Sequence, residues 1–240
     1  MNTEETSLAT GLPQMVRPES GSQITSLATG NTYTFHSKLG EGFFSEVYAC
    51  TDVWNNELAA KILKPRLPVE RMRDAATREF TTLLTVRNPY VTHTFDAFEF
   101  ASNFFIVTER CLNTVDSIFD IQDFNGMLWL MPIARCLLQA VQSLHVMGIA
   151  HQDIHLGNVM SFTQKDEMLP DRQAVWRFKL CDLGIARLLT DLAATELRKR
   201  SITPPEVLNT AIYGPLDHRI DIYHTGLILL QLARSERLVS

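Results

Sequence analysis

The stretch HQDIHLGN, residues 151–158, places two histidines, an aspartate and an asparagine close together, and CDLG, residues 181–184, adds a further carboxylate. Three hypotheses account for this pattern: a polar loop that follows a helix, a metal site built on the histidines, or a set of groups that hold Mg²⁺ and a nucleotide. His151 and His155 have the spacing of a helical pair, but they follow Gly148 in a predicted loop and lack the HExxH motif. The histidine-metal hypothesis is therefore the weaker one, and we expect His151 to be a packed, hydrogen-bonded structural residue.

The magnesium hypothesis rests on the oxygen atoms of three side chains. Mg²⁺ prefers hard oxygen ligands and shares its coordination shell with substrate phosphates. Asn158 and Asp182 would hold Mg²⁺ against the β- and γ-phosphates, which offsets charge in the transition state. Asp153 would lie beside an incoming hydroxyl, orient it and accept its proton.

The stretch LGEGFFSEVY, residues 39–48, joins two predicted strands and carries a pair of glycines. Because glycine lacks Cβ, the backbone at Gly40 and Gly42 can approach phosphates closely and offer them its N–H groups. A plain hairpin turn accounts for such a pair equally well. Ser45 stands where a third glycine would complete a GxGxxG motif and keeps a small side chain there.

Lys61 lies in AAKIL, residues 59–63, a predicted strand whose other residues are apolar and are expected to be buried. A buried lysine is unfavourable unless it is paired, and Glu79 in the following predicted helix is a natural partner. Such a pair would direct the ammonium group at an anionic ligand. The alternative is a surface lysine on an edge strand.

The order of predicted elements indicates an α+β fold with two lobes. Residues 1–30 are polar and without a clear period, which predicts a flexible arm. Strands follow from Asn31, and the spacing of apolar residues predicts one helix over residues 69–86. Beyond Thr114 the chain is mainly helical, so we expect a small β-rich lobe, a helical lobe and a cleft between them.

Composition excludes several functional classes. The chain of 240 residues is 45% apolar and 20% charged, with a net charge of −5 and no basic run, which argues against nucleic acid as a partner. Its four cysteines form no CxxC pair, and this usage suits a reducing cytoplasm. No signal peptide is visible, and Pro132 and Arg135 interrupt the most apolar segment, residues 126–150, which favours a core helix over a membrane span.

These motifs, in this order, resemble the eukaryotic-type protein kinase family over about residues 32–233. LGEGFFSEVY is similar to the family's glycine-rich loop, AAKIL to the strand with the ATP lysine, and FFIVTERC to the fifth strand and hinge. HQDIHLGNVM resembles the catalytic loop, CDLGIAR the metal-binding segment, and TPPEV and DHRIDIYHTG the segments that follow it. The resemblance implies a bilobal kinase-like domain over residues 31–240, with an N-lobe at 31–112 and a C-lobe at 113–240 that lacks the last family helices.

The resemblance also implies the site and its chemistry. The catalytic residues would be Asp153, Lys61 and Glu79, and the Mg²⁺ ligands Asn158 and Asp182. Thr108 would be the gatekeeper, and the backbone of Glu109 and Cys111 would meet adenine. The full set expected to bind ATP is Leu39, Gly40, Glu41, Gly42, Phe43, Phe44, Ser45, Val47, Ala59, Lys61, Thr108, Glu109, Cys111 and Met160. The implied function is transfer of the γ-phosphoryl group of Mg-ATP to a Ser or Thr hydroxyl of a protein.

Departures from the family pattern keep two alternatives open. His155 stands where Ser/Thr kinases usually carry a lysine, which is similar to small-molecule phosphotransferases of the aminoglycoside and choline type. Gln152 replaces the usual arginine, so we expect activity without a phosphorylated activation segment. The chain ends soon after the helix that contains residues 228–232, so we expect the apolar side of these residues to be exposed. We expect either reduced stability or a partner that covers this surface. A non-catalytic kinase-like scaffold is the second alternative.

Overall fold

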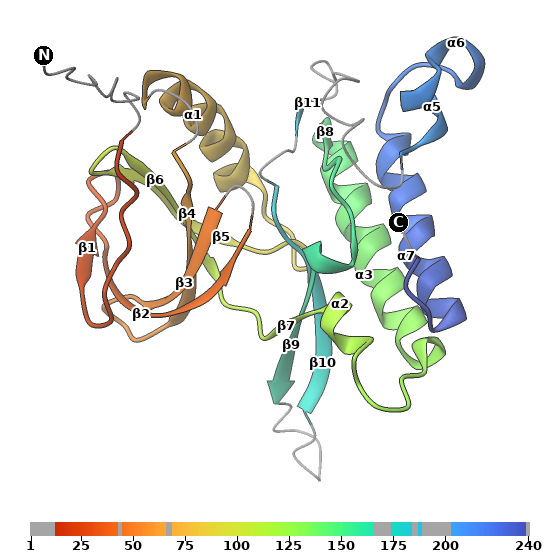
Figure 1. The fold of residues 1–240 in the computed structure, drawn as a ribbon, viewed down its shortest axis with the longest axis horizontal. Helices are drawn as coiled ribbons and strands as arrows, with labels where there is room; N and C mark the ends of the chain where they lie inside the picture. The colour runs from red at the N-terminus through yellow and green to blue at the C-terminus, as the bar shows by residue number, and fades with distance from the viewer. Residues whose placement is uncertain are drawn as a thin grey trace, which may run out of the picture. The chain divides into compact units, whose positions relative to one another are not determined.

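The computed structural model describes residues 13–42, 45–65, 69–165, 174–183, 187–188 and 203–238, without some side chains within these ranges. The chain divides into two compact units (Figure 1). Unit 1 comprises Met1–Leu84 and Thr94–Arg110, and unit 2 comprises Thr85–His93 and Cys111–Ser240.

Unit 1 is built on one antiparallel sheet of strand order β1-β2-β3-β4-β6-β5. The strands and the helix of this unit are β1 (Gln23–Thr25), β2 (Thr32–Glu41), β3 (Ser45–Thr51), β4 (Glu57–Leu63), α1 (Val69–Thr85), β5 (Thr94–Phe100) and β6 (Asn103–Glu109). Alternating apolar residues of these strands form its core, in which the rings of Phe98 and Phe105 stack with their centroids 5.2 Å apart. Apart from β1, these strands and the helix confirm the predicted elements.

The prediction of a flexible arm over residues 1–30 is wrong for residues 13–30. β1 pairs with β2, with Ile24 opposite Tyr33, and the side chain of Ile24 is buried in the core. Met15 and Val16 pack against the same core. This segment is ordered because it supplies apolar side chains and backbone hydrogen bonds to the sheet, although its sequence is mostly polar.

Unit 2 contains two long helices, α3 and α7, which pack alongside each other (Figure 1). Its elements are β7 (Asn113–Thr114), α2 (Val115–Ile118), α3 (Gly126–Val146), β8 (Ile149–Ala150), the 3₁₀ turn η1 (Leu156–Asn158), β9 (Val159–Lys165), β10 (Ala174–Leu180), β11 (Arg187–Leu188), α5 (Pro205–Leu208), α6 (Thr210–Tyr213) and α7 (Arg219–Arg234). β9 pairs with β10 and β7, and β11 pairs with β8. The short pairing of β11 with β8 brings Arg187 opposite Ala150, the residue that precedes residue 151.

The predicted boundary between the lobes lies between residues 112 and 113. The boundary between the two units differs from it. Thr85–His93 belongs to unit 2, since the N–H of Thr92 donates to the carbonyl of Leu180 (2.9 Å) and the N–H of Leu180 donates to the carbonyl of Tyr90 (2.8 Å). These bonds join segments about 90 residues apart, so local patterns in the sequence carry no signal for them.

The apolar residues of α3 and α7 form much of the core of unit 2. In α3, Ile133, Leu137 and Leu144 are fully buried, although the helix is long and apolar enough by composition to cross a membrane. The expectation of an exposed apolar side at residues 228–232 is wrong for Ile228 and Leu232, which are buried and belong to the face of α7 that packs on α3.

An apolar groove of about 540 Å³ nevertheless lies along α3 and α7. Leu138, Val146 and Ile222 line it and are each about half exposed or more. The partner that would cover this surface stays a prediction.

Gly126 allows the backbones of α3 and α7 to approach each other. A Cβ at this position would lie 2.0 Å from the carbonyl oxygen of Leu232, and the Gly126 N–H donates to Ser235 Oγ (2.9 Å). We expect Gly126→Ala to lower the free energy of unfolding by about 3 kcal/mol, as overpacking does in well-packed interiors. Urea unfolding followed by circular dichroism measures this change.

Gly226 in α7 provides the matched control, since a Cβ there would meet no atom within 4 Å. Gly226→Ala should raise the free energy of unfolding by about 0.5–1 kcal/mol, because alanine is the better helix former. Equal stabilities of the two alanine variants would show that the close approach at Gly126 contributes nothing.

Candidate functional site

In unit 1, the glycine pair lies where β2 ends and β3 begins. The N–H of Gly42 donates to the carbonyl of Ser45 (2.8 Å), which closes the turn. A Cβ on Gly40 would meet no atom within 4 Å, and one on Gly42 would meet only the Ser45 carbonyl oxygen at 3.9 Å. Packing therefore does not require either glycine, and both leave open space beside the backbone, as the approach of a phosphate would need. Phe43 and Phe44 lie outside the described residues.

Strand register places four predicted ATP-binding residues on one face of the sheet. Val47 is opposite Lys61 in the β3–β4 pair, and Ala59 is opposite Thr108 in the β4–β6 pair. These four side chains are half-buried, whereas their neighbours in β4, Ala60 and Ile62, are fully buried in the core. Because side chains alternate along a strand, the predicted set forms one continuous surface.

Lys61 lies in an interior strand, since β4 is flanked by β3 and β6. The alternative of a surface lysine on an edge strand is therefore wrong. Glu79 is in α1, as predicted, but its side chain is outside the described part of the chain, so its pairing with Lys61 stays a prediction. Leu39 and Glu41 lie in β2, Ser45 begins β3, and Glu109 ends β6.

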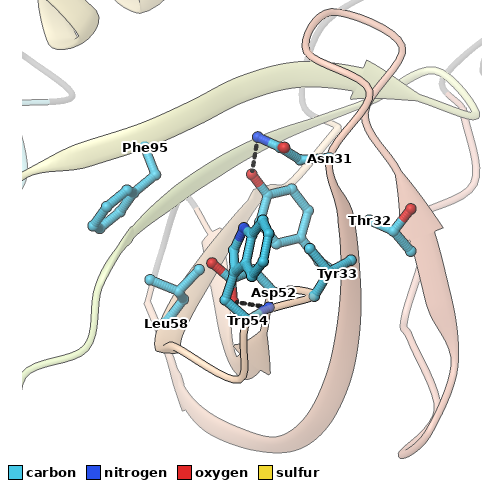
Figure 2. Close-up of a pocket in the computed structure, with 8 residues that line it drawn as sticks. Asn31, Thr32, Tyr33, Asp52, Trp54, Leu58 and Phe95 are labelled. Atoms are coloured by element: carbon cyan, nitrogen blue, oxygen red, sulfur yellow. Dashed lines mark hydrogen bonds between the residues drawn. The ribbon is translucent and has the colours of Figure 1, made fainter.

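A separate pocket of about 130 Å³ in unit 1 contains none of the predicted site residues (Figure 2). The exposed ring of Trp54 lies in this pocket beside Tyr33 and Leu58. Asp52 accepts the N–H groups of Trp54 and Asn56 (both 2.9 Å), so its carboxylate stabilises the β3–β4 turn.

In unit 2, the buried carboxylate of Asp221 holds the stretch HQDIHLGN in place. Its Oδ2 accepts the N–H of His151 (2.8 Å) and lies 2.8 Å from His145 Nε2, and its Oδ1 accepts the N–H of Gln152 (2.7 Å). Burial alone would raise the pKa of Asp221, but the hydrogen bond from His145 and the other donors outweigh it and hold that pKa below its usual range. The carboxylate is therefore ionised. The family resemblance singled out the segment that contains Asp221, DHRIDIYHTG, but assigned no anchoring role to its carboxylate.

His151 is a packed structural histidine, as predicted. It is fully buried, its Nε2–H donates to the carbonyl of Cys181 (2.9 Å), and its Nδ1 accepts the N–H of Asp153 (3.2 Å). Burial lowers its pKa, so the ring is neutral at neutral pH. The imidazole therefore connects the segments that contain Asp153 and Asp182.

Backbone strain is concentrated at two positions of this site. Gln152 and Asp182 adopt left-handed conformations, with φ of 66° and 64°. Such a conformation costs an L-residue roughly 1–2 kcal/mol. At Gln152 the hydrogen bond to buried Asp221 offsets this cost, which keeps the strained turn directly before Asp153.

The Asp153 carboxylate is partly exposed and lies next to an imidazole. Its side chain is 19% exposed, and its Oδ1 is 3.6 Å from His155 Nε2. Because His155 Nδ1 accepts the N–H of Gly157 (3.1 Å), the proton of the neutral ring is on Nε2, facing Asp153. Because the Asp153 carboxylate is partly exposed, solvent or an acceptor hydroxyl can reach it. Buried hydrogen bonds fix the backbone of Asp153.

Asn158 and Asp182 are brought together by the β9–β10 pair. Val159 is opposite Leu180, and the N–H of Cys181 donates to the carbonyl of Asn158 (2.9 Å). The side-chain Nδ2 of Asn158 donates to the carbonyl of Asp153 (2.8 Å), which directs Oδ1 away from that carbonyl. Both residues offer hard oxygen donors, and this donor set fits Mg²⁺.

The described residues contain no group of three or more His, Cys, Asp or Glu side chains that could hold a metal. Mg²⁺ commonly takes one or two protein oxygen ligands and completes its shell with water and phosphate oxygens. Cys111 and Met160 also lie in unit 2, and Met160 is in β9 opposite Lys179.

Comparisons with curated proteins identify similar chains. The chain is 30% identical over 210 residues to serine/threonine-protein kinase 10 of Danio rerio, and 29% identical over 206 residues to the serine/threonine-protein kinase fused of Drosophila melanogaster. These matches cover 83% and 82% of this chain but 20% and 23% of the two relatives. The chain thus spans about a fifth of the length of the curated relatives that it matches.

Among solved structures, the chain is similar to the PknI kinase domain of Mycobacterium tuberculosis, which was crystallised as a double mutant. The TM-score is 0.66 at 21% identity, and the match covers 94% of this chain and 79% of that one. This similarity confirms the predicted α+β, kinase-like fold. A family model described as the protein kinase domain matches residues 33–240. The chain therefore belongs to the protein kinase family.

Proposed function

We propose that this chain is an ATP-dependent protein kinase, which transfers the γ-phosphoryl group of Mg-ATP to a Ser or Thr hydroxyl of a protein. The observation that carries the proposal is the arrangement in unit 2: a partly exposed Asp153 on an anchored loop, next to Asn158 and Asp182, whose oxygens fit Mg²⁺. The choice of Ser or Thr is supported by the two relatives, both named serine/threonine kinases at about 30% identity.

In the proposed reaction, the acceptor oxygen forms a bond to the γ-phosphorus, and the bond from that phosphorus to the bridging oxygen breaks to release ADP. Asp153 orients the hydroxyl and accepts its proton. The backbone N–H groups near Gly40 and Gly42 and the ammonium group of Lys61 bind the phosphates. Mg²⁺, when bound by Asn158 and Asp182, supplies positive charge that offsets the charge of the transferring group.

A small-molecule phosphotransferase is the second candidate, favoured by His155. Its imidazole lies where the family resemblance leads us to expect a lysine, and its Nε2 faces Asp153. The neutral Nε2–H donor of His155, beside the proposed base Asp153, suits the hydroxyl of a small molecule as well as the hydroxyl of a peptide.

The proposed location is the cytoplasm. None of the four cysteines forms a disulfide, which fits a reducing compartment. The negative net charge fits the proposal that nucleic acid is not a partner.

A phosphotransfer assay tests the proposal. The purified chain is incubated with Mg²⁺ and γ-labelled ATP, with casein in one arm and an aminoglycoside or choline in the other. We expect label on Ser or Thr of the protein. Asp182→Asn should lower turnover by roughly 100-fold or more, because it removes the charged metal ligand.

The matched control is Asp123→Asn, which changes an exposed aspartate of unit 2 with a similar left-handed backbone (φ 58°). It should keep the turnover of the wild type. Label on the small molecule alone would support the second candidate, and no transfer to either acceptor would contradict both.

A further inference from the structure

The buried side-chain amide of Asn103 forms hydrogen bonds with the segment at residues 14–17. The side chain of Asn103 is 1% exposed, its Oδ1 accepts the N–H of Val16 (3.1 Å), and its Nδ2 donates to the carbonyl of Gln14 (3.0 Å). Met15 and Val16 also pack against the core of the sheet. This docking fixes the position from which the side chain of Arg17 extends.

Arg17 forms an ion pair with Glu46, a buried carboxylate of β3. Arg17 Nε and Nη2 lie 3.1 and 3.0 Å from Glu46 Oε1, and the Glu46 side chain is 1% exposed. The Tyr48 hydroxyl donates to Oε2 (2.7 Å), and Lys38 Nζ lies 3.2 Å from the same oxygen. Burial alone would raise the pKa of Glu46, but hydrogen bonds from Tyr48, Arg17 and Lys38 lower it, so the carboxylate is ionised.

The network continues from Glu46 to the glycine-rich turn. Glu41 is opposite Glu46 in the β2–β3 pair, and the two carboxylates would repel each other without a cation between them. Lys38 Nζ supplies it, at 2.6 Å from Glu41 Oε2. Lys64 Nζ bonds to Glu41 Oε1 and donates to the carbonyl of Gly42 (2.9 Å). Charged contacts thus run without a break from Arg17 to the backbone of the turn.

The strands that flank the turn pair irregularly. The β2–β3 register is irregular between Phe35 and Lys38 and again between Lys38 and Gly40. Gly40 and Gly42 contribute no side chain, and the space beside them is open. In the described part of the turn, the charged network supplies side-chain contacts that the two glycines cannot make. Removing Arg17 would leave Glu46 buried with one cation fewer, which favours rearrangement of the neighbouring Lys38–Glu41 contact.

We propose that Arg17 is a positioning residue for the phosphate-binding turn, which it holds through Glu46, Lys38, Glu41 and Lys64. This inference rests on the proposed function, in which Gly40 and Gly42 bind the phosphates of ATP. The segment around Arg17 thereby sets the affinity of the domain for nucleotide, although the family motifs begin only in β2.

The test compares Arg17→Ala with the wild type in steady-state kinetics and in binding of a fluorescent ATP analogue. We expect KM for ATP and the dissociation constant of the analogue to rise by about 3- to 10-fold, with kcat within about twofold. Arg17→Lys should recover part of the affinity, because its ammonium group can still pair with Glu46. Glu46→Gln removes the other partner and should weaken binding in the same way.

Arg73→Ala is the matched control. Arg73 is exposed in α1 and pairs with Glu99 at 2.7 Å, so this variant loses an arginine ion pair of unit 1 outside the network. It should leave nucleotide binding unchanged. Amide hydrogen exchange over residues 38–46 should be faster in Arg17→Ala than in Arg73→Ala, whether or not nucleotide is present.

The outcomes separate the two proposals. If the wild type binds and uses ATP but Arg17→Ala matches Arg73→Ala in KM, binding and exchange, the positioning role is overturned and the proposed function remains. A loss of stability in Arg17→Ala without weaker ATP binding would also overturn it. A wild type that binds no ATP would contradict both proposals at once.

Discussion

Asp153→Asn is expected to lower turnover in phosphoryl transfer by about 10²–10⁴-fold, the usual contribution of a positioned general base. ATP binding should change by less than about threefold, since Asp153 contacts the acceptor hydroxyl in the proposed reaction and no phosphate. The substitution keeps the shape of the side chain. It also keeps the backbone bonds of Asp153 to His151 Nδ1 (3.2 Å) and Asn158 Nδ2 (2.8 Å), so the loop should stay intact.

Initial rates and equilibrium binding of an ATP analogue, measured on the same preparations, separate these two effects. Asp123→Asn again serves as the control for replacing an aspartate of unit 2. Turnover of Asp153→Asn within a few-fold of the wild type would contradict the assignment of Asp153 as the base. If neither the wild type nor Asp153→Asn transfers phosphate, the result would favour a non-catalytic scaffold.

Asp221→Ala is expected to have the largest effect on stability, a loss of about 3–5 kcal/mol in the free energy of unfolding. The substitution leaves the buried N–H groups of His151 and Gln152 without their acceptor, and also removes the partner of His145. It releases the strained backbone of Gln152 as well, so any folded protein should have lost most of its phosphotransfer activity.

Asp217→Ala tests whether this effect is specific. Asp217 lies just before α7 and pairs with Arg219 at 2.9 Å, but it is partly exposed, and exposed ion pairs contribute only about 0–1 kcal/mol. Urea unfolding of both variants, followed by near-ultraviolet circular dichroism, gives the comparison. A difference below about 1 kcal/mol between them would mean that Asp221 does not anchor the loop.

Alternation of apolar residues was sufficient to predict β2 to β6, and helical spacing was sufficient for α1, because these elements bury one face against a core of their own unit. β1 was missed because it has three residues with a single buried side chain, Ile24, and its pairing depends on backbone hydrogen bonds. Burial of Ile228 and Leu232 was missed because it depends on packing against α3, a helix about 100 residues earlier in the chain.

The order of the motifs predicted most of the candidate site, and strand register then placed Val47, Ala59, Lys61 and Thr108 on one face. The residues that support the site were harder to predict. Asp221 lies 70 residues from the loop it anchors, and Arg17 lies 29 residues from Glu46. Neither distance produces a local pattern, since the partners meet only after the sheet and the helices have packed.

We propose that this domain transfers phosphate from Mg-ATP by means of Asp153, Asn158 and Asp182. The most direct measurement follows ADP release and γ-phosphoryl incorporation into a protein acceptor in one reaction of the wild type, with Mg²⁺ and with EDTA. We predict equal amounts of ADP and of phosphoserine plus phosphothreonine, both formed only with Mg²⁺. Binding of ATP without any formation of ADP or phosphoprotein would contradict the account.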